Sequence, residues 1–127
     1  MPHIGQYNKL KVIRQNNQGY FLNGDELGEL LLPAREVPSE VESGEEITIF
    51  LYHGPNGKLT PTTLKPLGTA GTFAYLRVTT VSTVGAFLNW GLPKDILVPF
   101  REQIIRLVEG KYYMDLIFRE LINHNLN

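Results

Sequence analysis

The string GAFLN at residues 85–89 decides the fold, because it repeats the string GYFLN at residues 19–23 after an interval of 66 residues. The same shift aligns further glycines, a proline and apolar residues. Twelve identities fall between residues 5–52 and 71–118, whereas average composition would give roughly three by chance. Glycines, prolines and apolar residues set turns and core faces, so the sequence predicts two copies of one fold.

Each copy is predicted to consist of short strands. In the first copy, alternating or short apolar runs bounded by turn residues cover residues 9–13, 21–23, 29–32, 47–52 and 58–63. In the second copy, the corresponding runs cover residues 73–81, 85–89, 96–98 and 112–118. Five short strands in about 60 residues fit a small Greek-key barrel of the OB-fold type. An SH3-like barrel is the alternative.

The predicted fold class is therefore all-β, with two tandem five-stranded OB-fold barrels and short helical turns. The first domain is expected at residues 1–66 and the second at residues 67–127. Ile104, Ile105 and Val108 have helical spacing and predict a short helix over residues 102–108. Residues 118–127 do not match the first copy. The second barrel is thus expected to close with a poor fifth strand or a helical tail, or to be truncated.

Composition and charge limit the classes of function. The chain has no cysteine, and no apolar run approaches the ~20 residues that span a bilayer. The N-terminus lacks the apolar segment of a signal peptide, so we expect a cytoplasmic protein with no membrane contact. Residues 1–66 hold six basic and eight acidic side chains, a net of −2, and residues 67–127 hold six and five, a net of +1. The second domain is the better candidate for binding nucleic acid.

Three strings identify a family resemblance: LLLPAREVP at residues 30–38, GTFAYLRV at residues 71–78 and WGLPKD at residues 90–95. Over residues 4–118 the chain resembles the bacterial conserved virulence factor B family. The resemblance implies tandem S1-type domains, followed in family members by a further such domain and a winged-helix domain. It implies an RNA-binding regulator rather than an enzyme. This chain lacks the C-terminal parts, which indicates an N-terminal fragment or a naturally short relative.

The candidate binding residues face outward in the predicted strands. Phe21 and Phe87 follow their glycines by two positions, where S1-type domains carry an exposed aromatic, so they are candidates for stacking on bases. The alternative places both rings in the core. Asn89 shares their face. Gln18 and Val84 stand where such domains carry another aromatic, so we expect weak binding of single-stranded RNA by this chain alone.

Further candidates lie on the first strand of each copy and in the WGLPKD loop. Lys9, Lys11, Tyr75 and Arg77 occupy the outward register of the first strands, where a cation could contact phosphate. Trp90 could stack on a base, plug one end of a barrel or fill the seam between the domains, and the seam is slightly favoured.

Other chemistry finds little support in the sequence. The three histidines, at positions 3, 53 and 124, lack metal-ligand spacing, and we expect no cofactor or metal. The alternative function is a protein-interaction or assembly module that uses the same barrels without nucleic acid. Asp115 replaces the apolar Ile49 of the first copy, and the sequence offers no functional account of it.

Overall fold

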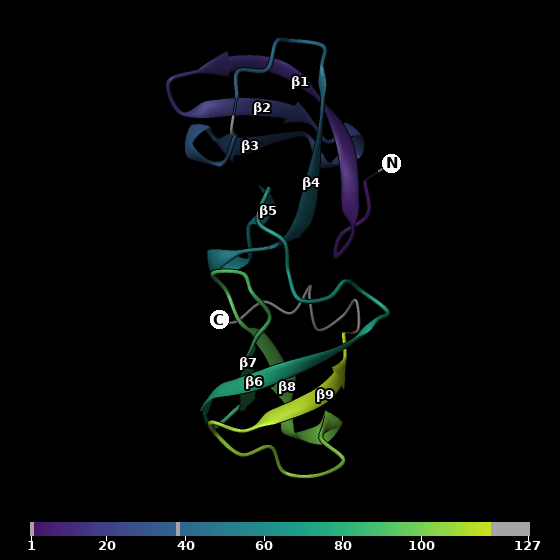
Figure 1. Cartoon of the computed structure of the whole chain (residues 1–127), viewed down its shortest axis with the longest axis vertical. Helices are drawn as coiled ribbons and strands as arrows, with labels where there is room; N and C mark the ends of the chain where they lie inside the picture. Colours follow the sequence, from purple (N-terminus) through teal and green to yellow (C-terminus); the bar gives the residue numbers. More distant parts are fainter. Residues whose placement is uncertain (1, 38, 118–127) are drawn as a thin grey trace.

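A computed structural model describes residues 2–37 and 39–117 of the chain. Its regular structure is all β: a nearly closed five-stranded barrel is followed by a four-stranded sheet, and the two are stacked along the long axis of the molecule (Figure 1). We call them the first barrel and the second sheet. The predicted all-β fold class is confirmed. The expected closing segment of the second unit, residues 118–127, lies outside the described residues.

The first barrel has the strand order β3-β2-β1-β4-β5, and every neighbouring pair is antiparallel. β3 also lies against β5, which brings the two edges of the sheet together. Its strands are β1 (Tyr7–Asn16), β2 (Gly19–Asn23), β3 (Glu29–Pro33), β4 (Glu46–His53) and β5 (Leu59–Thr62). Short 3-10 turns connect them: η1 (Asp25–Leu27), η2 (Ala34–Glu36) and η3 (Pro55–Gly57).

The second sheet has the order β8-β7-β6-β9, which matches the first four strands of the barrel. Its elements are β6 (Phe73–Val81), β7 (Gly85–Asn89), β8 (Ile96–Pro99), η4 (Phe100–Glu102) and β9 (Tyr112–Leu116). The pairing register is also shared. Val12 pairs with Leu22 and Val78 with Leu88, and a register shift follows at the same place in both units. The repeat in the sequence is therefore a repeat in the backbone.

The glycine that opens the repeated string is required by a close approach of two strands. Gly85 has φ of 152°, and a Cβ there would lie 2.4 Å from the carbonyl oxygen of Val98. Gly19 has φ of 149°, and its Cβ would lie 2.2 Å from the carbonyl oxygen of Leu32. Only glycine tolerates both the positive φ and the contact, so this residue lets the second strand of each unit pair closely with the third.

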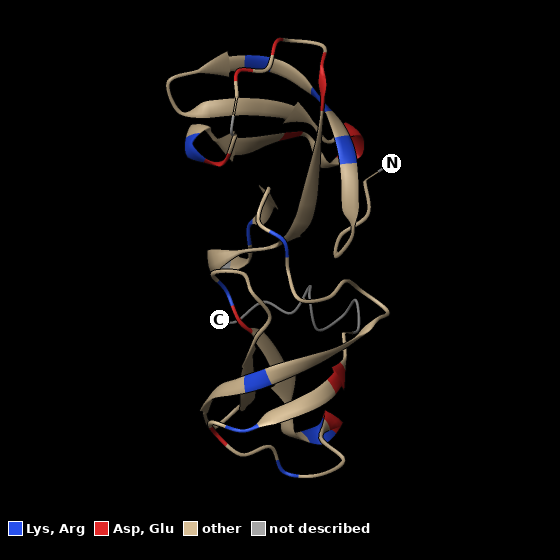
Figure 2. Ribbon diagram, in the orientation of Figure 1, with Lys and Arg blue, Asp and Glu red and all other residues tan. Residues whose placement is uncertain are grey.

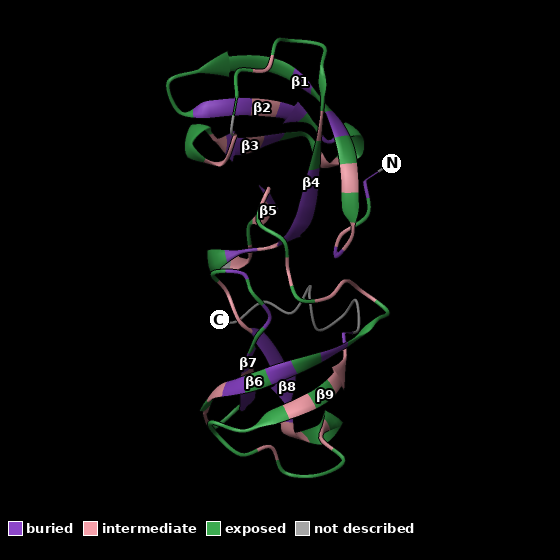
Figure 3. Ribbon diagram, viewed as in Figure 1, coloured by how far each residue is buried: buried purple, intermediate pink, exposed green. Residues whose placement is uncertain are grey.

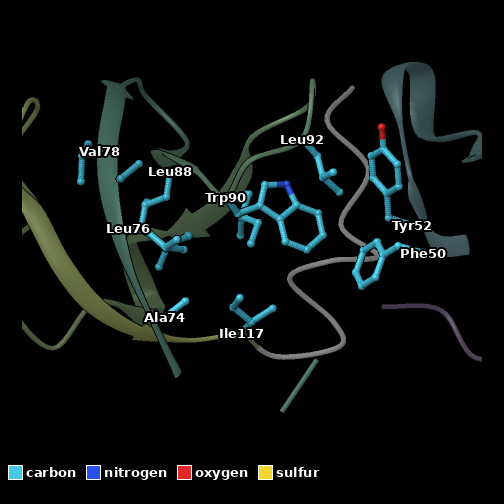
Figure 4. Close-up of a cluster of buried hydrophobic side chains, with 12 residues drawn as sticks. Phe50, Tyr52, Ala74, Leu76, Val78, Leu88, Trp90, Leu92 and Ile117 are labelled. Carbon is cyan, nitrogen blue, oxygen red and sulfur yellow. The ribbon is translucent and has the colours of Figure 1, made fainter. Parts of the chain in front are cut away.

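Most strands bury one face, whereas β8 and the C-terminal half of β4 are buried on both faces. The core of the first barrel consists of Leu10, Val12, Tyr20, Leu22, Leu30, Leu32, Ile49 and Leu51. The side chains of Phe50 and Tyr52 alternate with Ile49 and Leu51, point to the opposite face of β4 and join the core of the second sheet (Figure 4). Figure 3 shows this end of β4 as buried. That second core also contains Leu76, Leu88 and other apolar residues of the second sheet. The two halves of the chain therefore share a hydrophobic core.

Trp90 is the centre of this shared core. Its side chain is 2% exposed, and its ring lies edge-on to Phe50 at 5.6 Å and to Tyr52 at 6.0 Å between centroids (Figure 4). The indole N–H donates to the carbonyl of Lys94 at 2.7 Å, so its only polar atom is satisfied inside the WGLPKD loop. Backbone bonds reinforce the seam: the amide of Ala70 donates to the carbonyl of Gly5 at 2.9 Å.

The connection between the units runs over residues 63–72, between the end of β5 and the start of β6. The predicted division into domains 1–66 and 67–127 falls within this connection. We keep that division as a proposal, since the shared core joins the two units where they meet end to end.

The predicted helix over residues 102–108 is wrong. The chain makes only the 3-10 turn η4 and then runs irregularly to β9. The side chain of Gln103 replaces helical backbone bonds, donating to the carbonyl of Val98 and accepting from the amide of Leu107, both at 3.0 Å. Ile104 is fully exposed, so a helix here would bury too little apolar surface to be stable. Within the described residues, no helix has the length and apolar character needed to cross a membrane.

Replacing Trp90 with alanine tests the shared core. We expect Trp90→Ala to lower the free energy of unfolding by about 3–5 kcal/mol, because the cavity would lie between two units that each depend on it. The halves should then melt in separate steps, observed by circular dichroism. Trp90→Phe, which retains an aromatic ring, should lose less stability. An alanine variant that melts in one step at the wild-type temperature would contradict the claim that Trp90 joins the two units in a shared core.

Candidate nucleic-acid interface

The predicted site residues of the second sheet face outward together. Ala86 and Leu88 are fully buried, so Phe87 and Asn89 project from the opposite face of β7. On β6, Leu76 is likewise buried between exposed Tyr75 and Arg77. The outward register predicted for these strands is confirmed. Arg77 pairs directly with Asn89, and Phe87 pairs with Thr80 beyond the bulge, which brings the β6 and β7 candidates onto one surface.

The two repeated phenylalanines have different surroundings. Both are partly exposed, but the guanidinium of Arg14 lies over the Phe21 ring at 4.2 Å and is held there by an ion pair with Glu29 at 2.7 Å. The position of Arg14 corresponds to Thr80 in the second sheet, where no guanidinium is available. A base could therefore approach the ring of Phe87, whereas at Phe21 it would first have to displace a cation already in place.

A second difference separates the outward cations of β1 from those of β6. Lys9 and Lys11 are exposed as predicted, but they line a shallow cavity of about 180 Å³ together with Asp25 and Glu46. Those carboxylates offset the lysines and would repel phosphate. The corresponding positions in the second sheet are Gly91 and Tyr112, which leave Arg77 without an acidic neighbour in this register. The first barrel therefore has predicted cations, but not a basic surface around them.

Asn89 contributes to the turn that follows β7. Its Oδ1 accepts a hydrogen bond from the amide of Gly91 at 2.9 Å, and Asn23 does the same for Asp25 in the first barrel. The side chain therefore has a structural role in both units. Only its amide nitrogen is left to meet a ligand, so we regard Asn89 as a minor contact.

Trp90 does not belong to this surface. Its burial in the shared core, described above, leaves no face for a base, and the structure supports the seam alternative instead of the stacking one. Lys94, from the same loop, is also withdrawn. Its Nζ is buried, and burial lowers the pKa of the Lys94 ammonium below its ordinary value. Among the described residues of the second unit, the exposed cations are Arg77, Arg101 of η4, and Arg106 and Lys111 of the segment before β9.

Sequence reasoning missed the aromatic and apolar side chains that β9 adds to the surface. Tyr112 pairs with Arg77, and Met114 pairs with Tyr75. The Tyr75 and Tyr112 rings stack at 5.4 Å between centroids with an interplanar angle of 21°. The 66-residue shift would have revealed the difference, since it places Tyr112 on Glu46 and Met114 on Thr48. On the outward face, the aromatic Tyr112 thus takes the place of a charged residue, Glu46, which marks this position as a candidate binding residue.

One cavity of the second sheet opens next to this surface. It has a volume of about 330 Å³ and lies between η4, the segment after it and β9. Asp115 lines it, with an Oδ2 atom that is buried and has no hydrogen-bond partner. Burial raises the pKa of this carboxyl above its ordinary 3.8, and the carboxylate of Glu102 adds to the rise, while a backbone hydrogen bond from Leu116 opposes it. The described residues contain no cluster of three or more side chains suited to a metal ion.

Comparisons with known proteins agree with the all-β fold. The S1 domain family matches residues 4–64. Conserved virulence factor B of Staphylococcus haemolyticus is 29% identical over 101 residues, which cover 78% of this chain and 34% of the relative. The uncharacterized protein YitL of Bacillus subtilis is 32% identical over 95 residues, which cover 74% of this chain and 32% of the relative. The chain thus spans about a third of the length of the curated relatives it matches.

A solved structure shares the arrangement of both units. A multidomain protein with nucleic acid binding domains from Streptococcus pneumoniae matches with a TM-score of 0.71 and 27% sequence identity. The match covers 87% of this chain and 40% of that chain, so it extends over the first barrel and most of the second sheet.

The buried carboxyl of Asp115 predicts a pH-dependent stability. Because its pKa is raised in the folded state, its favourable contribution is complete below the ordinary value and is lost as the pH rises through the raised value. Asp115→Asn should therefore raise the melting temperature at neutral pH and change it little in acid. Glu109 is exposed, so Glu109→Gln is the control and should leave the melting temperature unchanged at both pH values. An Asp115→Asn variant that is destabilised at neutral pH would show that the carboxylate is well paired.

Proposed function

The chain belongs to the conserved virulence factor B family, with an S1 domain at residues 4–64, and from that premise we propose that it binds single-stranded RNA through the outer face of the second sheet. The family points to a non-catalytic, nucleic-acid-binding fold. Phe87 would stack on a base, Arg77 would contact a phosphate, and Tyr75 would extend the surface beside them. The role we propose is that of an RNA-binding part of a bacterial regulatory protein, acting without a cofactor.

One observation carries this proposal: the repeat holds two equivalent phenylalanines, and among the described residues a cation covers Phe21 but none covers Phe87. Aromatic stacking is worth about 1–3 kcal/mol per base in proteins that bind single strands. At Phe21 the same contact would have to break the Arg14 cation–π contact and disturb its ion pair with Glu29. We therefore assign the principal stacking site to the second sheet and a mainly architectural role to the first barrel.

The charge distribution sets the expected strength of binding. The whole chain has a net charge of −1, and charged residues of both signs are spread over the two units (Figure 2). With few phosphate contacts, binding should be weak, in the micromolar range or above. Its dependence on salt should also be shallow, because each neutralised phosphate of a single strand contributes only about 0.7 to the slope of log K against log salt concentration.

Phe87→Ala and Phe21→Ala form a matched pair that tests the proposal. We expect Phe87→Ala to weaken the binding of a single-stranded RNA by about 1–3 kcal/mol in a fluorescence titration, the loss of one stacked base. Phe21→Ala should weaken it less. Both variants should stay folded, because each ring lies on the outer face of its strand.

Melting curves of the same two proteins separate a site residue from a core residue. A loss of about 3–5 kcal/mol of stability in Phe87→Ala would move that ring into the core and remove it from the interface. Equal losses of affinity in both variants would mean that the two units share the ligand. Absence of any binding by the wild type at low salt would defeat the proposed function as a whole.

A further inference from the structure

The outer face of β6 and β9 exposes more aromatic and apolar surface than the fold requires. Its members are Phe73 at 68% exposure, Tyr75 at 62%, Tyr112 at 54% and Met114 at 64%. They are neighbours. Met114 pairs with Tyr75, the Tyr112 ring stacks on Tyr75, and Phe73 precedes Tyr75 by two residues on the same side of β6. We call these four residues the β6–β9 face. A contiguous exposed patch of this kind in a soluble protein usually marks a binding surface.

The first barrel shows that the backbone does not need three of these side chains, whereas Phe73 corresponds to Tyr7, an aromatic that is itself 45% exposed. The same register places Lys9 opposite Thr48 on β1 and β4, where the second sheet has Tyr75 opposite Met114. Glu46 stands at the position of Tyr112. The β1–β4 and β6–β9 pairs have the same register, so this pairing does not by itself require Tyr75, Tyr112 and Met114. A ligand of the second sheet explains the difference.

Charge at the edge of this face points to an anionic ligand. Glu45 precedes β4 and Glu46 begins it, whereas at the equivalent positions Lys111 precedes β9 and Tyr112 begins it. Red segments mark this acidic entry to β4 in the first barrel (Figure 2). The backbone fixes Lys111 near Arg77, because its carbonyl accepts a hydrogen bond from the amide of Val78 at 2.9 Å.

Further upstream in the same segments, the sign of the side-chain charge again differs between the two units. Exposed Glu40 of the first unit corresponds to exposed Arg106 of the second. Two carboxylates of this segment are thus replaced by two cations at aligned positions of the repeat, Glu40 by Arg106 and Glu45 by Lys111, while Ser43 is replaced by Glu109. The Arg106 guanidinium lies over the Phe100 ring at 4.6 Å, so Lys111 is the cation nearer to the β6–β9 face. An apolar partner alone would not favour this exchange, whereas a phosphate backbone beside stacked bases would.

We propose that the β6–β9 face is a second base-stacking site, continuous with the Phe87 site through Arg77. Arg77 joins the two because it pairs with Asn89 on one side and with Tyr112 on the other. The Tyr75 and Tyr112 rings are already stacked and remain more than half exposed, so a base can lengthen the stack on the open side of either ring. The strand then crosses β7, β6 and β9, with Arg77 and Lys111 at its phosphates. This inference rests on the proposed function.

The length of the RNA provides the test. Single OB-folds bind about 4 to 16 nucleotides, so oligouridylates at both ends of this range are titrated against the whole chain at low salt. The wild type should bind the long oligomer more tightly than the short one. Tyr112→Ala should remove about five- to 150-fold of affinity for the long oligomer, the equivalent of one lost stack, and leave the short one nearly unchanged. Phe87→Ala should weaken both.

Back-substitution with the residues of the first barrel supplies the controls. Lys111→Glu and Tyr75→Lys place first-barrel residues on a backbone that accepts them, so both variants should fold and melt like the wild type. Lys111→Glu should weaken the binding of the long oligomer and reduce the salt dependence of that binding. Lys9→Ala in the first barrel should change neither the affinity for the long oligomer nor its salt dependence.

The outcomes separate the two proposals. If the wild type binds no oligomer, the proposed function fails and this inference fails with it. If the wild type binds and Phe87→Ala weakens it, but Tyr112→Ala leaves the effect of length unchanged, only the β6–β9 site is overturned. A Tyr112→Ala variant that binds RNA normally but dissociates a self-associated wild type in sedimentation would assign the face to protein contacts and would likewise overturn the inference.

Discussion

Burial of the Trp90 indole between Phe50 and Tyr52 is the contact on which the rest of the structure depends. It requires the C-terminal half of β4 to be apolar on both faces, so Ile49 and Leu51 build the first barrel while Phe50 and Tyr52, which alternate with them, build the shared core. It also requires the WGLPKD loop to curl back far enough for the carbonyl of Lys94 to accept the indole N–H. A unit of about 60 residues has a marginal core of its own, and this contact lets each half stabilise the other.

Against this fixed scaffold, the two copies have divergent outer faces. The first barrel covers Phe21 with Arg14 and surrounds Lys9 and Lys11 with carboxylates. The second sheet uncovers the equivalent phenylalanine and replaces charged residues with aromatic ones along β9. Equal backbones with different surfaces indicate a division of labour: one unit serves the fold, and the other serves the ligand. The small net charge of the chain conceals this division, because opposite tendencies in the two halves cancel.

The sequence predicted the features that depend on local periodicity and on the repeat. The strands, the outward register of Phe87 and Arg77, and the shared fold all follow from alternation and from glycines that a close strand contact requires. The helix over residues 102–108 could not be excluded from spacing alone, because only the structure shows that Ile104 has no core to face. The position of Trp90 depended on side chains of β4, nearly 40 residues away, that no local pattern connects to it. The β6–β9 face could have been predicted from the aligned repeat, but only from the positions at which the two copies differ, such as Tyr112 aligned with Glu46.

The central claim is that the second sheet, and not the first barrel, carries the RNA. A titration of the isotopically labelled whole chain with single-stranded RNA, followed by the backbone amide shifts, tests it most directly. We expect the shifted amides to lie on β6, β7 and β9, around Phe87, Arg77 and Tyr112, with little change on β1, β2 and β4. Shifts centred on Phe21 and Lys11 of the first barrel, with the second sheet unaffected, would contradict the account.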